Sequence, residues 1–312
     1  MNSPLIYHGE WWIPAKLDPS LQMLLFEPES MMGKENRYTG TLTYYEDKGT
    51  TLELYQIPSN FRGRYHGSNP VIWGKDANGN IFTLFNVDLK NHFLGDFTKT
   101  EFTVGLILIG IHVLSLDDTS FNQCIVKFPY LRNWAFHSNL TCQLGEKYNY
   151  YISLSDSIFS DFLVNADVES GVKWLLRDKW KMRESSYDLS INQYTEFVIE
   201  SSDGISIRSY LKHITEFSQF LSIALYCEQN PIEVRFKAFK SQQESFLLFE
   251  KDVSIDLKVS SLIKFKLLKD KVPAILRSWH ENFDKVAPIS RYLLDSLRSN
   301  KTFDVPDFLI IA

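Results

Sequence analysis

The stretch GTLTYYEDKGTTLELY, residues 40–55, decides the fold class of this chain. Leu42 and Tyr44 alternate with polar residues before EDKG, and Leu52 and Leu54 alternate with polar residues after it. A period of two is typical of a half-buried strand, and EDKG supplies the residues of a turn. The stretch is therefore predicted to be a β-hairpin.

The same pattern continues outward from this hairpin. PVIWGKDANGNIFTLFNV, residues 70–87, predicts a second hairpin whose turn contains Asn78-Gly79, a strong turn dipeptide. Strands are predicted over 104–113 and 122–129, and no helical period appears before about residue 155. Many short strands with regular turns favour a sandwich or jelly-roll-like domain.

The second half of the chain mixes helix and strand. Strands are predicted over 194–201 and 231–238, and Ser206 can cap a helix that runs to about Cys227. The apolar residues of that helix follow the i, i+3, i+4 rule, and Asn230-Pro231 is expected to stop it.

Strand-like segments near 246–258 precede a helical pattern that begins after Pro273 and is predicted to restart at Pro288. The fold class is thus α+β and β-rich. The expected organisation is a sandwich-like domain over 1–150, a mixed domain over 151–268 and a helical connector over 269–312.

Composition places the chain among globular proteins, with 44% hydrophobic and 23% charged residues. The net charge of −5 argues against general nucleic-acid binding, which needs a basic footprint. Three widely spaced cysteines fit a reducing cytosol. No signal peptide is recognised, and the apolar run 104–113 is half the length of a membrane span of ~20 residues. A cytoplasmic location without membrane contact is expected.

Motifs for metal binding or nucleophilic catalysis are not recognised. No two histidines form H-x-x-x-H or H-E-x-x-H, and there is no G-x-S-x-G or P-loop. His112 is predicted to be a hydrogen-bonded core residue, and Asp117-Asp118 to form a turn. We therefore expect no catalytic residue, no metal and no cofactor.

LRNWAFHS, residues 131–138, carries the R-x4-6-H spacing that marks the active site of HEPN-type ribonucleases. That chemistry needs the Arg and the His on a helix, whereas this stretch follows Pro129 in a region of strands. Pro129 and the local Trp/Phe content suit a strand end or turn better than a helix interior. They favour packing for Trp134 and Phe136, with Arg132 and His137 at the rim.

VKWLLRDKWKMR, residues 172–183, alternates apolar and basic side chains and predicts a strand or hairpin with one cationic face. Its basic residues are Lys173, Arg177, Lys179, Lys181 and Arg183. They could bind an anionic partner. They could equally be the solvated face of an edge strand, where lysine discourages aggregation, and this second interpretation is favoured.

Taken together, several stretches resemble the N-terminal domain of ApeA-type proteins. They are GEWWIP (9–14), the hairpin above, LIGIHV (108–113), the strand-then-LRNW block (121–134) and FSQFLSIAL (217–225). The resemblance rests on their order and spacing across roughly residues 9–300. ApeA-type proteins are bacterial anti-phage, abortive-infection proteins in which this domain precedes a HEPN ribonuclease domain.

The resemblance implies a non-catalytic sensor or regulatory module whose partner is a HEPN ribonuclease domain, in cis or in trans. A phage protein would be its trigger. The family's R-x4-6-H lies in the HEPN domain, so Arg132 and His137 do not correspond to it. DFLIIA, residues 307–312, looks like the opening of the HEPN domain's first helix, which suggests a chain that lacks its effector.

The apolar stripe of residues 273–312 would then be an interaction surface. It would pack against the HEPN bundle or, in a homodimer, against a second copy of the chain. Two alternatives remain open. One is a carbohydrate- or peptide-binding β-sandwich unrelated to defence. The other is a nuclease in its own right that uses Arg132 and His137.

Overall fold

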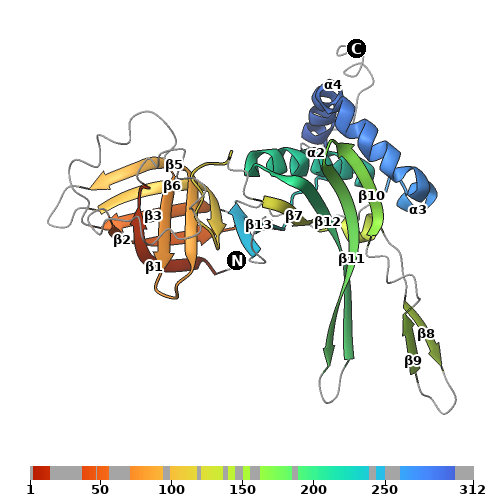
Figure 1. The fold of residues 1–312 in the computed structure, drawn as a ribbon, viewed down its shortest axis with the longest axis horizontal. Coiled ribbons are helices and arrows are strands. Elements are labelled where there is room, and N and C mark those ends of the chain that lie inside the picture. The colour runs from red at the N-terminus through yellow and green to blue at the C-terminus, as the bar shows by residue number, and fades with distance from the viewer. Residues whose placement is uncertain are drawn as a thin grey trace. The chain divides into compact units, whose positions relative to one another are not determined.

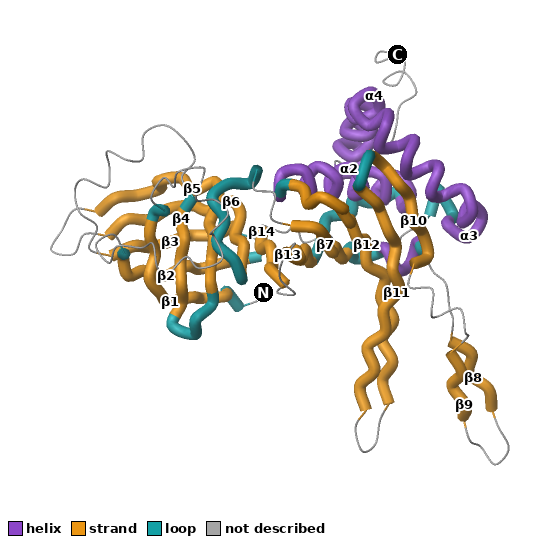
Figure 2. Tube along the Cα trace, viewed as in Figure 1, coloured by secondary structure: helices purple, strands orange, loops and turns teal. Residues whose placement is uncertain are grey.

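The computed structural model describes residues 3–14, 37–46, 48–55, 71–93, 99–117, 121–135, 140–144, 150–154, 162–184, 189–238, 244–249 and 261–298. These residues form two compact units that interleave along the chain. The first unit comprises Met1–Asn122, Gly204–Ser209 and Glu233–Ser254, and the second comprises Gln123–Asp203, Tyr210–Ile232 and Ile255–Ala312. The predicted β-rich α+β class is confirmed, and Figure 2 shows the described helices gathered almost wholly in the second unit.

Six strands of the first unit close into a barrel (Figure 1). They are β1 (Leu5–Trp12), β2 (Tyr38–Tyr45), β3 (Gly49–Tyr55), β4 (Ile72–Asp76), β5 (Ile81–Phe93) and β6 (Lys99–Ile109). The antiparallel pairs run β6-β3-β2-β1-β4-β5, and β5 pairs with β6 to complete the ring. The sandwich-like arrangement expected from the sequence is therefore realised as a barrel, which removes the exposed strand edges.

The hairpins predicted over residues 40–55 and 70–87 are formed by the pairs β2–β3 and β4–β5. In β2, Leu42 and Tyr44 are buried, because alternate side chains of a strand point to the same face. At the β4–β5 turn, Gly79 adopts a φ of +85°, which a glycine reaches without steric cost. The Asp76 carboxylate accepts hydrogen bonds from the backbone N–H groups of Asn78 and Asn80 at 2.9 and 2.8 Å.

Two more strands extend this unit. β14 (Glu244–Phe249) pairs with Leu106–Ile109 of β6, beyond the part of β6 that β3 covers, and β13 (Glu233–Ala238) pairs with β14. The hydroxyl of Tyr44 donates a 2.9 Å hydrogen bond to the carbonyl of Phe249, 205 residues along the chain. Contacts of such long range fix β14 against the barrel.

The sheet of the second unit runs β10-β11-β12-β7. Its strands are β10 (Phe162–Glu169), β11 (Val172–Glu184), β12 (Leu189–Ile205) and β7 (Phe121–Lys127). A separate hairpin joins β8 (Leu140–Leu144) to β9 (Tyr150–Leu154). The helices are α1 (Leu131–Trp134), α2 (Ile207–Leu225), α3 (Phe265–Leu268), the 3-10 turn η7 (Lys269–Lys271) and α4 (Val272–Arg298).

Helix α2 begins where the sequence predicts, because the Ser206 hydroxyl accepts a hydrogen bond from the Ser209 N–H at 3.1 Å. It ends at Leu225, where Tyr226 turns into the left-handed region with a φ of +51°. Phe217 of α2 stacks on Phe197 of β12 with ring centroids 3.8 Å apart. This contact places α2 against the sheet.

Two local predictions are wrong. The helix expected to restart at Pro288 is continuous through it. Pro288 lies on the exposed side of α4, while the neighbouring Ala287 and Ser290 are buried and hold that turn by packing. The LRNW block, expected at a strand end or turn, is the one-turn helix α1, because Leu131 and Trp134 lie on one face and are both buried.

Candidate functional site

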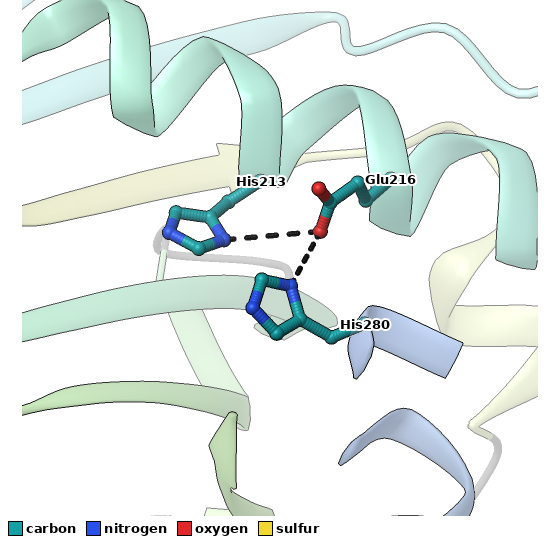
Figure 3. Close-up of side chains that lie close together, drawn as sticks. All are labelled: His213, Glu216 and His280. Atoms are coloured by element: carbon teal, nitrogen blue, oxygen red, sulfur yellow. Dashed lines mark hydrogen bonds and ion pairs between the residues drawn. The ribbon is translucent and has the colours of Figure 1, made fainter. Parts of the chain in front are cut away.

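Four titratable side chains of the second unit converge between α2, α4 and the end of β10. His213 and Glu216 are three residues apart on α2 and therefore share one face of that helix. His280 comes from α4, and Glu169 is the last residue of β10. Figure 3 shows both histidine rings turned toward the Glu216 carboxylate. We call these four residues the His-Glu cluster.

Glu216 and Glu169 contact opposite sides of the two rings. The Glu216 Oε2 atom lies 2.7 Å from His280 Nδ1 and 4.0 Å from His213 Nδ1 (Figure 3). Glu169 Oε1 lies 3.3 Å from His213 Nε2, and Glu169 Oε2 lies 3.6 Å from His280 Nε2. Each imidazole therefore has one carboxylate on its Nδ1 side and the other on its Nε2 side.

The cluster lies largely away from solvent. The side chains of His213 and Glu216 are 3% and 1% exposed, whereas that of Glu169 is 47% exposed. Trp174 of β11 packs edge-on against the rings of His213 and His280, with centroids 5.8 and 5.6 Å away. An apolar wall of this kind strengthens electrostatic interactions inside it, because water screens them less.

The two histidines are electrostatically different. Burial lowers the pKa of His213, although Glu169 and Glu216 oppose this effect. The hydrogen bond to Glu216 raises the pKa of His280. The pKa values of the two neighbouring imidazoles are thus shifted in opposite directions.

Chemically, the His-Glu cluster offers two imidazole nitrogens and a carboxylate oxygen within 4.8 Å of one another. These are ligand types that bind zinc. The cluster cannot be recognised from the sequence, because His280 is 64 residues from Glu216 in the chain. The one local signal was the H-x-x-E spacing of His213 and Glu216 on a predicted helix.

The predicted cationic residues lie on β11, which is the strand that the sequence indicated. It is not the edge strand that was favoured, because β12 pairs with it along its whole length and β10 pairs with its first half, Val172–Arg177. Arg177 stands opposite Glu196 of β12 and contacts its carboxylate at 2.9 Å, with the two side chains 13% and 2% exposed. Lys173 lies 3.8 Å from Asp167, and Lys181 is exposed. Lys179 is half-buried, and Arg183 belongs to the strand near its end.

The Arg132 guanidinium of α1 donates a hydrogen bond to the side chain of Gln193 on β12. Gln193 in turn donates to Asp178 at 2.9 Å, which places Arg132 in a polar network of the sheet. His137, the other member of the R-x4-H pair, lies outside the described residues.

The remaining candidates have structural contacts in the first unit. His112 stacks on Trp73 with ring centroids 4.7 Å apart, and its Nε2 lies 3.2 Å from the carbonyl oxygen of Gly74. It is the hydrogen-bonded core residue that the sequence predicted. Asp117 pairs with Arg208 through Oδ1 and Nε at 2.6 Å, and Asp118 lies outside the described residues.

Among the described residues, no helix is both long enough and apolar enough to span a membrane. No curated protein and no solved structure matches the chain. One family model does match, and its description is ApeA N-terminal domain 1. The match covers residues 6–279, which include nearly all of the described strands and three members of the His-Glu cluster, and it ends one residue before His280. By this match over well more than half of its length, the chain belongs to the ApeA N-terminal domain family.

Proposed function

We propose that this chain is the non-catalytic sensor module of an anti-phage system. It would recognise a phage component and control a HEPN ribonuclease that acts in cis or in trans. The observation that carries the proposal is the family match over residues 6–279, which makes the chain an anti-phage defence module. Recognition of a phage protein and control of the nuclease are the steps that the proposal adds.

Helix α4 is the element best suited to pass a signal to the effector. It is tied to α2 along its length by three polar contacts. Trp279 Nε1 donates to the Glu216 carbonyl at 2.9 Å, His280 meets the Glu216 carboxylate, and Ser290 Oγ donates to Gln219 Oε1 at 2.7 Å. Leu276 and Phe283 are buried beside these contacts. A displacement of α2 would therefore carry α4 with it.

In this proposal a phage protein shifts the effector between an inactive and an active arrangement. It does so only by as much as it binds one arrangement better than the other. The basic residues of β11 are the proposed contact for an anionic partner. Arg177 is already engaged by Glu196, so Lys179, Lys181 and Arg183 would carry most of that contact, with Lys173 at the near end.

The test compares the chain alone with the chain linked to the HEPN domain of an ApeA-type relative. Both versions are expressed in a bacterial host, which is challenged with a panel of phages. Efficiency of plaquing and the integrity of cellular tRNA are measured. We expect protection and tRNA cleavage with the linked protein, during infection, and neither with the chain alone. A linked protein with an inactivated HEPN histidine is the matched control.

Purified chain is also incubated with total tRNA, beside an Arg132→Ala/His137→Ala variant. Cleavage by the chain that disappears in the double variant would overturn the non-catalytic role and support the nuclease alternative. Linked protein that cleaves tRNA equally with and without phage would show an effector that this module does not control.

A further inference from the structure

The Nδ1 atom of His213 is buried and makes no hydrogen bond with any residue that the structure describes. Its other nitrogen, Nε2, faces Glu169 and can donate its proton there. Nδ1 then carries a lone pair, which points toward the Glu216 carboxylate oxygen 4.0 Å away (Figure 3). Two lone pairs that face each other in a buried site repel unless a cation lies between them.

We propose that the His-Glu cluster is a zinc site in which His213 Nδ1, His280 Nδ1 and Glu216 Oε2 are the ligands. A tetrahedral zinc ion with bonds of about 2.0 to 2.1 Å holds neighbouring ligand atoms about 3.3 Å apart. The two separations from Glu216 Oε2, 2.7 Å to His280 and 4.0 Å to His213, lie on either side of that value. The separation between the two imidazole nitrogens is no more than 4.8 Å, so side-chain adjustments of about an ångström would bring all three ligand atoms to the ion. The fourth position is left for water.

Glu169 is placed to hydrogen-bond to the histidines without binding the ion itself, and we call it their outer partner. Histidines that bind a metal through one ring nitrogen usually donate the other N–H to a carboxylate, which fixes the tautomer and ring orientation. Glu169 faces Nε2 of both histidines, at 3.3 and 3.6 Å. A single carboxylate thus orients both imidazoles with their Nδ1 atoms toward Glu216.

The charges of the site balance around a divalent ion. The ion would replace the proton that lies between His280 Nδ1 and Glu216 Oε2, and that proton would be released to solvent. Two neutral imidazoles, the Glu216 carboxylate and the Glu169 carboxylate would then surround a charge of +2. Lys212 is a further charged group near the cluster. Its Nζ lies 3.8 Å from Glu216 Oε1, the oxygen that is not assigned to the ion, and its side chain is 62% exposed. Lys212 is therefore free to remain in solvent when the ion binds.

The ion would cross-link α2 to α4, since His213 and Glu216 belong to one helix and His280 to the other. The ion would fix α4 relative to α2, and this would hold for any effector. The zinc site therefore does not depend on the proposed sensor role and can be tested separately from it.

The test uses tag-free protein freed of metal with a chelator. Zn²⁺ binding is measured by titration calorimetry, and the coordination by the visible absorption of added Co²⁺. We expect one ion per chain, a four-coordinate Co²⁺ spectrum without thiolate absorption, and a higher Tm with Zn²⁺. Glu216→Gln and His280→Gln should abolish stoichiometric binding. His8→Gln, which removes a histidine on β1 that contacts Thr41, is the matched control and should bind as the wild type does.

Glu169→Gln keeps the proposal falsifiable if the buried variants fail to fold, because Glu169 is 47% exposed. Loss of an outer partner should weaken zinc binding about 10- to 100-fold without changing the stoichiometry. The proposal is overturned if wild-type protein takes up no stoichiometric Zn²⁺. It is equally overturned if Glu169→Gln leaves the affinity unchanged, or if His8→Gln removes the binding.

Discussion

Arg177 and Glu196 are predicted to compensate each other's charge within the second unit rather than to serve a partner, so the loss of either one should be costly. The two residues stand opposite each other on β11 and β12, 2.9 Å apart, and the Glu196 side chain is 2% exposed. Removing one member of a buried pair costs about 3–5 kcal/mol, because the other charge stays away from water. Arg177→Met should therefore lower the free energy of unfolding by about 3–5 kcal/mol.

Replacing both residues tests whether the loss of stability in Arg177→Met comes from the Glu196 charge that is left buried without its partner. Arg177→Met/Glu196→Leu removes both charges and keeps apolar volume, so its stability should lie within about 1 kcal/mol of wild type. Glu196→Gln should cost about 1–3 kcal/mol, because Arg177 is 13% exposed and the amide oxygen still accepts a hydrogen bond. The Arg177→Met variant should therefore be the least stable of the three.

Urea unfolding followed by circular dichroism measures these differences. At an m-value of about 3 kcal/mol/M, a loss of 3–5 kcal/mol lowers the midpoint by about 1–1.7 M. Hydrogen exchange of the β11 and β12 amides localises the effect to the second unit. An Arg177→Met cost below about 1 kcal/mol, or a double variant no more stable than Arg177→Met, would contradict this prediction.

Three further perturbations test other parts of the structure. Charge reversal of Lys179 and Lys181 to Glu should change stability by no more than about 0.5 kcal/mol, as thermal melts would show, while weakening any binding to an anionic partner. Gly74→Ala should destabilise the barrel by about 1–3 kcal/mol or more in urea unfolding, because a Cβ atom there would lie 2.1 Å from the Trp11 ring. Burial raises the pKa of Tyr44 to about 12, above its usual value of 10.0. Its contribution to stability is thus complete below pH ~10 and lost as the pH rises toward ~12, so stability measured over this range should fall less steeply in Tyr44→Phe.

Features that depend on local patterns could be predicted from the amino-acid sequence. Alternation of apolar residues predicted the hairpin over 40–55 and the strand at 172–183, because burial of one face imposes a period of two. Asn78-Gly79 marked a turn, and Ser206 marked the start of α2. The order of such stretches also indicated the family that the family model confirms.

Tertiary structure decided which distant residues meet. A periodic pattern reports that a side chain is buried, but it does not identify what covers it. The closed ring of the barrel therefore could not be predicted, and neither could the pairing of Arg177 with Glu196. Continuity of α4 through Pro288 likewise depends on the packing of Ser290 against α2.

The His-Glu cluster shows the same limit most clearly. His213 and Glu216 are neighbours on one helix face, but His280 and Glu169 reach them from sequence positions tens of residues away. Side chains so far apart in sequence meet only when α4 and β10 pack beside α2. Local sequence could thus specify the helix that presents two members of the cluster, and the folding of the second unit supplied the other two.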